Sequence, residues 1–514
     1  MFLLSILIGV LVLGMVILIH ELGHFIMAKR AGILCHEFSI GMGPLIYSKK
    51  KGETLYAIRA IPLGGYVSMA GEEVSSELIK PGQDIKVLRE GNVITHMIMN
   101  PEDERYEEAE QIHVESIDLQ GKGDKPLSIN GQIVDDQAYY VFKNKELQVA
   151  PYDRSFDSKT LMERFLTIFA GPFMNIVLAF FLFIIISLFV GFPAQDDQGQ
   201  VTTEIGMIAE NSPASKHLEI GDKITAIEGT TIESWSELQS VIRNHAGQRE
   251  IALTFMRDGQ THTEVFTPTT SIISAGFATP SDDDFSTVSV GQVVPSAPAD
   301  RAGLKSGDII LEIDGVSISN WREVVTAMQA NEAGERMDFV VERDGETKEL
   351  SFEPYPKEVI ESQGYAMVLT QFGISPVYEN NVMRSIFVAG FTGVAGAGTL
   401  IFDTLRLLFG GTVHVGELAG PVGIFSLISS AYQQGLITLF NFIAFLSVNL
   451  AILNLLPIPA LDGGRLVFLG YEAITRRKVN KTVENYLHML MFFLLIALIL
   501  FVTYNDILRL LNIG

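Results

Sequence analysis

The chain has 514 residues, of which 48% are hydrophobic, and its mean hydropathy is +0.29. It carries 60 Asp and Glu residues against 37 Lys and Arg residues, a net charge of −23. This length excludes a single small domain, and the acidic balance excludes a nucleic-acid-binding protein, because contact with phosphates requires basic surface. The single cysteine, Cys35, excludes an internal disulfide and a thiolate zinc site. Any metal must therefore be held by His and carboxylate side chains.

The apolar residues lie in a few long runs. Each run is long enough to cross a hydrocarbon core, which takes roughly 20 residues. The four runs are residues 2–28, 165–192, 436–459 and 485–511. The first run is longer than the apolar core of a signal peptide and lacks a small-residue cleavage site. We therefore expect a membrane protein with a core of four transmembrane helices.

Basic residues flank two of these runs. Lys29 and Arg30 follow the first, together with residues 49–51, and the basic cluster of residues 476–481 precedes the last. The positive-inside rule places such clusters in the cytoplasm. Both termini are then expected outside the cytoplasm.

The region after the second run contains an internal repeat. Equivalent residues are Gly221 and Gly307, Trp235 and Trp321, and Arg257 and Arg343, each pair 86 residues apart. The repeat predicts two α/β modules, residues 198–270 and 286–353, each with short strands and a helix that follows the Trp. The pattern resembles the PDZ domains of bacterial proteases, which add a peptide strand to a sheet edge. The alternative is that the two modules are only a spacer.

Two further segments separate the apolar runs. Residues 72–160 contain acidic clusters and alternating stretches, which predict a small β-rich cytoplasmic insertion without assignable chemistry. Residues 382–411 are apolar, but polar residues and many glycines interrupt them, which favours an amphipathic segment at the outer interface or one that is partly inserted. If residues 382–411 crossed the membrane fully, the run at 436–459 would end outside the cytoplasm. The residues that follow it would then lie on the side opposite the first basic cluster.

The candidate chemistry lies inside the first run. His20-Glu21-Leu22-Gly23-His24 is an H-E-x-x-H motif, whose four-residue step puts both histidines on one helix face, where they can bind zinc. Glu21 would act as the general base toward the attacking water. Ionisable groups are costly within a membrane helix, so their presence there favours a functional role. The alternative is a helix end whose polar residues only reach the interface.

A catalytic zinc needs a third protein ligand. The best candidate is Asp462, which follows the third apolar run in the Pro- and Gly-rich segment from Asn454 to Arg465. An ordinary turn before Gly463 and Gly464 is the alternative.

Five motifs together resemble the site-2 protease family of intramembrane zinc metalloproteases, in particular the bacterial RseP type with extracytoplasmic PDZ domains. They are His20 to His24, Phe38 to Gly43, Ile61 to Val67, Gly171 to Asn175, and Asn454 to Arg465. The resemblance covers nearly the whole chain except the insertion at 72–160.

The resemblance implies a role for each site residue. Asp462 would be the third zinc ligand and Glu21 the catalytic glutamate. Residues 54–67 would form a membrane-embedded β-hairpin or loop whose edge accepts the substrate as an added strand. The candidate substrate-binding residues are Tyr56, Ile58, Gly64 and Gly65 of this segment, with Asn449 and Asn454 near the third run. Ordinary interhelical hydrogen bonding is the alternative for the two asparagines, and Asn175 is expected to be structural.

These expectations describe a zinc endopeptidase of the bacterial inner (cytoplasmic) membrane. It would cleave peptide bonds within or beside single transmembrane helices, and the resemblance implies trimmed anti-sigma factors and remnant signal peptides as substrates. One alternative is a catalytically silent membrane scaffold whose PDZ pair binds partners. Another is a metal transporter, although a transporter would carry acidic or His sites along several spans.

Overall fold

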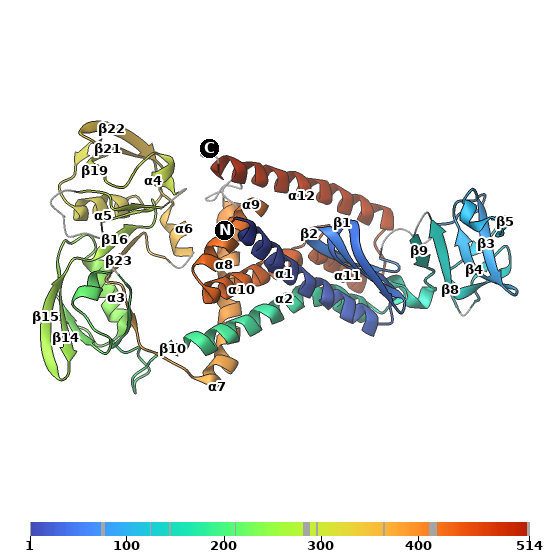
Figure 1. Cartoon of the computed structure of the whole chain (residues 1–514), viewed down its shortest axis with the longest axis horizontal. Helices are drawn as coiled ribbons and strands as arrows, with labels where there is room; N and C mark the ends of the chain where they lie inside the picture. The colour runs from blue at the N-terminus through green and yellow to red at the C-terminus, as the bar shows by residue number, and fades with distance from the viewer. Residues whose placement is uncertain are drawn as a thin grey trace. The chain divides into compact units, whose positions relative to one another are not determined.

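The computed structural model describes residues 2–72, 78–123, 125–142, 145–210, 212–280, 288–294, 297–362, 365–410 and 419–510. The expected boundaries at residues 1, 286, 411 and 511 lie outside these ranges. The chain forms two units (Figure 1), of which the first contains residues 1–183 and 421–500 and the second contains residues 184–420 and 501–514. Each is described by itself.

The first unit is built mainly on helices, several of which are long and apolar. They are α1 (Phe2–Arg30), α2 (Leu161–Val190), α9 (Pro421–Gln433), α10 (Leu436–Leu455), α11 (Asp462–Thr475) and α12 (Lys481–Leu510), of which α2 and α12 continue into the second unit. A helix satisfies its backbone hydrogen bonds internally, which is why near-continuous apolar sequence adopts this form in lipid.

Five helices in the described part of the chain are long and apolar enough to cross a membrane. Four coincide with the expected runs, at Leu7–Arg30, Leu161–Val190, Leu436–Leu455 and Lys481–Leu508. The fifth, Val382–Gly410, coincides with the segment expected at the interface. Several such helices fit a multi-pass membrane protein.

The fifth helix is continuous despite its polar residues. It consists of α7 (Val382–Arg384), a π-helical turn (Ser385–Ala389) and α8 (Gly390–Gly410). Thr392, Thr399 and Thr404 each donate a side-chain hydrogen bond to the carbonyl four residues earlier, at 2.8–3.1 Å. The hydroxyl groups are satisfied within the helix and do not interrupt it. Placement of this helix at the outer interface remains a prediction.

Two long strands, β1 (Cys35–Lys51) and β2 (Thr54–Met69), follow α1. Both strands bend back on themselves, so their pairing places four segments side by side in the order 45–51, 54–59, 35–40 and 65–69. The expected hairpin at residues 54–67 is therefore only half of the sheet, because β1 contributes the other half. Segment 54–59 is paired on both sides, whereas segment 65–69 forms an edge.

Glycines allow the two reversals. Gly41 has a φ of 83° and Gly64 a φ of 93°, a backbone region that other residues rarely adopt. A Cβ atom on Gly41 would also lie 2.7 Å from the carbonyl oxygen of Ile61. The Phe38 to Gly43 and Ile61 to Val67 motifs therefore contain the points where β1 and β2 turn back.

The β-rich character expected for residues 72–160 is confirmed. The strands are β3 (Asp84–Glu90), β4 (Val93–Ile98), β5 (Glu110–His113), β6 (Ile117–Asp118), β7 (Ser128–Ile129), β8 (Gln132–Phe142) and β9 (Lys145–Gln148). They form one sheet in the order β5-β3-β4-β8-β7-β6, with β9 paired to β8. This insertion is a separate lobe beyond the β1–β2 sheet in Figure 1. Its core is apolar and includes Ile85, Ile94 and Met97.

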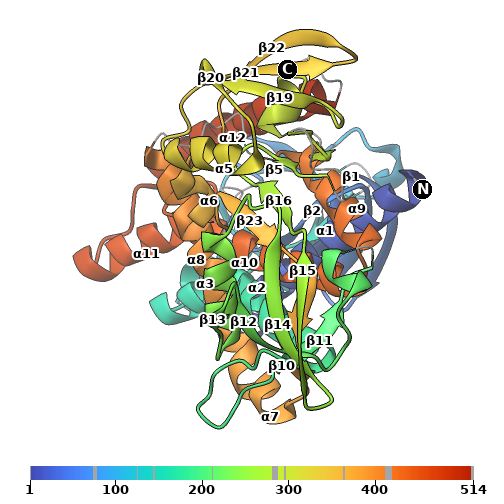
Figure 2. The same cartoon turned by 90° about the vertical axis from the view of Figure 1, so that its left-hand side faces the viewer.

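The second unit contains the two repeated modules (Figure 2). The first has β12 (Lys223–Ile227), β13 (Thr230–Thr231), α3 (Trp235–Asn244), β14 (Ile251–Arg257) and β15 (Gln260–Phe266). The second has α4 (Pro298–Arg301), β19 (Ile309–Ile313), β20 (Val316–Ser317), α5 (Trp321–Ala330), β21 (Met337–Arg343) and β22 (Glu346–Phe352). The equivalent strands pair in the same order in both modules. The repeat found in the sequence is therefore a repeat of structure.

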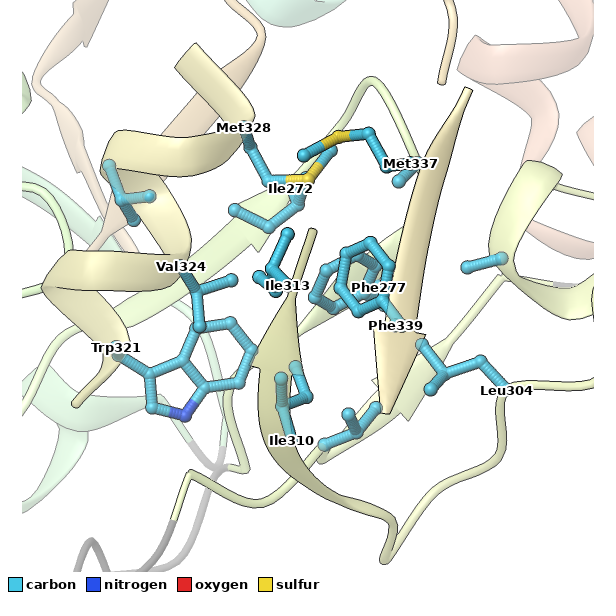
Figure 3. Close-up of a cluster of buried hydrophobic side chains, with 14 of the residues drawn as sticks. Ile272, Phe277, Leu304, Ile310, Ile313, Trp321, Val324, Met328, Met337 and Phe339 are labelled. Atoms are coloured by element: carbon cyan, nitrogen blue, oxygen red, sulfur yellow. The ribbon is translucent and has the colours of Figure 1, made fainter. Parts of the chain in front are cut away.

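Short strands join the modules to one another and to the neighbouring helices. They are β10 (Phe192–Pro193), β11 (Ile205–Ile208), β16 (Thr269–Ile272), β17 (Phe277–Ala278), β18 (Gln292–Val293), β23 (Val368–Gln371), β24 (Ile374–Pro376) and β25 (Tyr378–Glu379), with helix α6 (Lys357–Ser362). The core of the second module includes Ile272 and Phe277 (Figure 3), together with Val368. The core of the first module includes Phe372. Both modules therefore extend beyond the expected ranges of 198–270 and 286–353.

A buried ion pair recurs in the two modules. Arg257 donates hydrogen bonds of 2.7 and 2.6 Å to the two carboxylate oxygens of Asp222, and Arg343 donates bonds of 2.5 and 2.6 Å to those of Asp308. Burial alone would raise the pKa of each carboxyl group, but the arginine bonds outweigh it and hold the pKa below its usual range. In each module this pair links the Gly-Asp turn to the strand whose last residue is the Arg of the Arg-Asp-Gly sequence.

We predict that Asp308→Asn lowers the free energy of unfolding of the second module by about 2–4 kcal/mol at pH 7, because the Arg343 charge loses its partner. The difference in unfolding free energy between the wild type and this variant should disappear as the pH falls below about 4. There the Asp308 carboxyl of the unfolded chain takes up a proton first, and that of the folded chain follows at lower pH. Urea unfolding can be followed by tryptophan fluorescence, since the chain has 2 Trp residues and both lie in the modules. The control is Asp344→Asn at the adjacent exposed turn. Equal stability of the two variants at pH 7 would contradict the prediction.

Candidate metalloprotease active site

Helices α1 and α2 pack against each other through residues that recur at every fourth position of each helix. The Nδ1 atom of His24 lies 2.8 Å from the carbonyl oxygen of Thr167, and the Nδ1 atom of His20 lies 3.3 Å from the side-chain nitrogen of Asn175. The two helices are therefore antiparallel here. Gly171, between Thr167 and Asn175, has no room for a side chain, because its Cβ would lie 2.2 Å from His24 Nε2. Small residues permit such close approach between membrane helices.

The third candidate ligand reaches the same point from α11. Asp462 is the first residue of this helix and follows the loop after α10. Cβ atoms on Gly463 and Gly464 would lie 2.1 Å and 2.4 Å from backbone oxygens of that loop. The two glycines therefore allow the loop to fold tightly against the start of α11. The Asp-Gly-Gly sequence is thus more than the ordinary turn that was the alternative.

The three side chains offer their ligand atoms at nearly equal separations. The Nε2 atoms of His20 and His24 are 3.3 Å apart, and they lie 3.2 Å and 3.4 Å from Asp462 Oδ2. Tetrahedral zinc with ligand bonds of about 2.0–2.1 Å holds its ligand atoms about 3.3 Å apart. Oδ2 of Asp462 is buried and accepts no well-formed hydrogen bond within the described part of the chain. The donor set and its geometry therefore fit zinc.

This cluster is unusual within the protein. Among the described residues, no other group of three His, Cys, Asp or Glu side chains is positioned to share a metal ion. Both histidines are buried. The cluster consists of two imidazoles and one carboxylate.

The partners of the ring nitrogens decide which nitrogen of each histidine faces the metal position. Thr167 offers a carbonyl oxygen, so His24 donates through Nδ1 and presents the lone pair of Nε2. Near His20, the amide nitrogen of Asn175 is 3.3 Å from Nδ1, while the amide oxygen is buried without a hydrogen-bond partner in the described structure. Exchanging the two amide atoms lets Oδ1 accept a proton from His20 Nδ1, which leaves the lone pair of His20 Nε2 facing the metal position. The polar contact expected of Asn175 is thus made with His20, a candidate metal ligand.

Glu21 lies beside the edge of the β1–β2 sheet. A Cβ atom on Gly65 would be 3.1 Å from Cγ of Glu21 and 2.9 Å from the carbonyl oxygen of Ser39. The absence of a side chain at Gly65 therefore lets the edge segment 65–69 approach the glutamate. The two consecutive glycines of the Ile61 to Val67 motif therefore have different roles, since Gly64 permits the chain reversal and Gly65 permits this approach.

One large cavity of about 1330 Å³ contains the site. His20, Glu21, His24 and Asp462 line it, and so do Gly65 and Asn454, two of the expected substrate-binding residues.

The structure does not bring the other expected substrate-binding residues into this cavity. Tyr56 and Ile58 lie in segment 54–59, whose backbone is paired on both sides, so they cannot add a further strand. Gly64 lies at a chain reversal, and Asn449 lies in α10 outside the cavity lining. Segment 65–69, which forms an edge of the sheet, lines the cavity instead.

Sequence reasoning missed Thr167 and Gly171 as parts of the site. Thr167 acts through its carbonyl, which every residue has, so its identity carries no signal. The regular spacing of Thr167, Gly171 and Asn175 along α2 was the available clue, because it matches the spacing of His20 and His24 on α1.

Comparison with known proteins gives the family. Residues 8–498 match the model of peptidase family M50. The zinc metalloprotease RasP of Oceanobacillus iheyensis is 31% identical over 98% of both chains. The regulator of sigma-W protease RasP of Bacillus subtilis is 32% identical over 99% of this chain and 100% of its own, and a putative zinc metalloprotease of Staphylococcus aureus is 32% identical over 99% of both chains.

One solved structure shares a short stretch. The solution structure of GtR34C from Geobacillus thermodenitrificans matches 14% of this chain and 83% of its own, at 28% identity and a TM-score of 0.13. That score is too low to support a statement about the fold.

The family match covers nearly the whole chain and agrees with a helix-borne H-E-x-x-H motif that meets an aspartate from the far end of the sequence. The chain belongs to peptidase family M50, the site-2 protease family, and is a membrane metalloprotease.

Proposed function

We propose that the protein is an intramembrane zinc endopeptidase whose metal is held by His20, His24 and Asp462. The observation that carries the proposal is the triangle of ligand atoms with sides of 3.2, 3.3 and 3.4 Å, contributed by α1 and α11. Zinc held by these residues would lower the pKa of a water molecule and polarise the scissile carbonyl. The relatives named as zinc metalloproteases support the same metal.

The residues of the chain perform the remaining steps. Glu21 accepts a proton from the attacking water and delivers it to the leaving amine. The edge at residues 65–69 binds the substrate backbone as an added strand, which keeps it unwound. Unwinding is required because a helix engages its carbonyl groups in internal hydrogen bonds. Asn454, which lines the cavity, offers an amide to the same backbone.

The proposed substrates are single-span membrane proteins, in particular trimmed anti-sigma factors and remnant signal peptides. The Bacillus subtilis relative supports this class, since its name is regulator of sigma-W protease. We further propose that the protein lies in the bacterial inner (cytoplasmic) membrane, with the repeated modules outside as PDZ-like domains. Two folded modules at that position would exclude substrates that still carry a large outer domain.

The rival proposal is a catalytically silent scaffold, in which the modules bind partners and no metal is needed. The matched ligand distances and the hydrogen-bond partners of both histidines favour the enzyme, because a vestigial site has no need of them. A transporter would carry further ligand clusters, and none is found among the described residues.

We predict that Glu21→Gln retains zinc but lowers peptide-bond cleavage by at least about 100-fold, because the amide cannot accept the proton of the attacking water. His24→Ala should instead lose zinc. The measurements are zinc content by atomic emission and cleavage of a single-span model substrate in proteoliposomes. Wild-type turnover by purified Glu21→Gln would refute the assigned role.

We also predict that Asn175→Leu weakens zinc binding by about 10–100-fold, because His20 loses the acceptor that orients its ring. Asn175→Asp should restore binding, since a carboxylate accepts the same proton. Chelator competition measures the affinity without any need for catalysis. The matched control is Ser447→Ala, which removes the 2.8 Å hydrogen bond to the backbone carbonyl of Asn175 and leaves its amide in place. Unchanged zinc affinity in Asn175→Leu would show that the amide does not position His20.

A further inference from the structure

The insertion of residues 72–160 shares a cavity with the active site. Residues Tyr139, Glu146, Leu147 and Gln148 of the insertion line the same space of about 1330 Å³ as Glu21. The C-terminal end of the insertion is also bonded to the residues next to β1 and β2, since Leu34 donates to the carbonyl of Arg154 at 2.9 Å and Phe156 donates to that of Ala70 at 2.7 Å. The insertion is thus attached beside the site.

Strand β9 faces this cavity with its edge. Successive side chains of a strand point to opposite faces, so a wall made by one face would contain alternate residues. Three consecutive residues, 146–148, line the cavity instead. The consecutive residues 65–69 of β2 line it in the same way. Two strand edges therefore border one space.

The hydrogen-bond register identifies which groups of β9 are free. Val149 donates to the carbonyl of Ala138 at 2.7 Å, so this facing pair is a hydrogen-bonded one. Facing pairs alternate along an antiparallel ladder, and Glu146 faces Val141. Glu146 and Gln148 therefore direct their backbone groups away from β8. The bond made by Val141 is consistent with this assignment. Its carbonyl accepts a 2.9 Å hydrogen bond from Met99, which lies on the side of β8 away from β9.

We infer that the free edge of β9 binds the cytoplasmic flank of the substrate as an extended strand, next to the part held by residues 65–69. The inference rests on the proposed function. A substrate that is unwound at the active site continues as an extended chain, and the unpaired backbone of β9 borders the same cavity. The insertion thereby lengthens the peptide-binding surface beyond the membrane.

Charge supports this occupant. The flank of a membrane helix on the cytoplasmic side is rich in Lys and Arg. The insertion has 19 acidic and 10 basic residues, a net charge of −9. Several acidic residues of the cavity are already paired, such as Glu53 with Lys29 and Arg154, whereas Glu146 has no ion pair within the described structure. A basic flank is therefore attracted to β9.

The test uses proline at outward-facing edge positions, where it removes a free N–H group and leaves the ladder to the neighbouring strand intact. Glu146→Pro changes the cavity edge. Gln111→Pro is the matched control at the far edge of the same sheet. Val114 donates to the carbonyl of Gln83, so the alternation leaves the N–H group of Gln111 pointing outward from β5. Both full-length variants are compared on a single-span substrate with a lysine-containing cytoplasmic flank and on one truncated at the membrane.

Glu146→Pro should lower cleavage of the flanked substrate by about fivefold, the loss expected for one backbone hydrogen bond, and should cleave the truncated substrate at the rate of Gln111→Pro. Equal cleavage of the flanked substrate by the two variants would overturn the inference while leaving the proposed function intact. Failure of the wild-type protein to cleave either substrate would overturn both.

A second measurement does not depend on the proline variants folding. A benzophenone photocrosslinker at position 146, in the Glu21→Gln protein, should crosslink to the cytoplasmic flank of the bound substrate. The same group at position 111 should not. Crosslinking at neither position, while a photocrosslinker at position 66 captures the substrate, would exclude β9 as the binding edge.

Discussion

The close packing of α1 against α2 is the constraint on which the site depends. His24 lies so near α2 that any side chain at Gly171 would overlap its ring, and a Cβ on Gly23 would lie 2.2 Å from the carbonyl of Ala170. This contact brings the carbonyl of Thr167 and the amide of Asn175 within reach of the two imidazoles. Ligands on one helix are thus oriented by the neighbouring helix, in an apolar region where unsatisfied polar groups are costly.

The edge of the β1–β2 sheet is the second requirement for intramembrane cleavage. A membrane helix must lose its internal hydrogen bonds before a water molecule can attack one of its carbonyl groups, and the lost bonds must be replaced within the site. Gly65 allows the edge segment to lie against Glu21, so the place where a substrate would be extended adjoins the place where a proton would be taken up. Strand β9 would continue the same support on the side of the insertion.

Much of this organisation could be predicted from the sequence. The H-E-x-x-H spacing predicted that His20 and His24 share one helix face, because helical periodicity is a local property. Asp462 was only a candidate from its Pro- and Gly-rich segment, and its proposed role as third ligand came from the family resemblance. The 86-residue repeat likewise gave two modules with the same elements, which the structure contains at Trp235 and Trp321. The β-rich nature of the insertion followed from its alternating pattern.

The remainder depends on contacts between distant segments. Two-residue strands such as β17 and β18 have no periodicity to detect, so the extended cores of the modules were missed. The double pairing of segment 54–59 moves the free edge away from Tyr56 and Ile58, because β1 and β2 both fold back on themselves. In the helix at 382–410, the threonine hydroxyl groups donate hydrogen bonds to backbone carbonyls of the same helix. These polar residues therefore interrupt the helix less than the sequence indicated.

X-ray absorption at the zinc K-edge of the purified protein tests the central claim most directly. The account predicts one zinc ion per chain, with two imidazole nitrogens and carboxylate oxygen at about 2.0–2.2 Å. It also predicts loss of the carboxylate contribution in Asp462→Ala, and loss of one imidazole in His24→Ala. A spectrum that contains sulfur, or one that is unchanged in Asp462→Ala, would contradict the account.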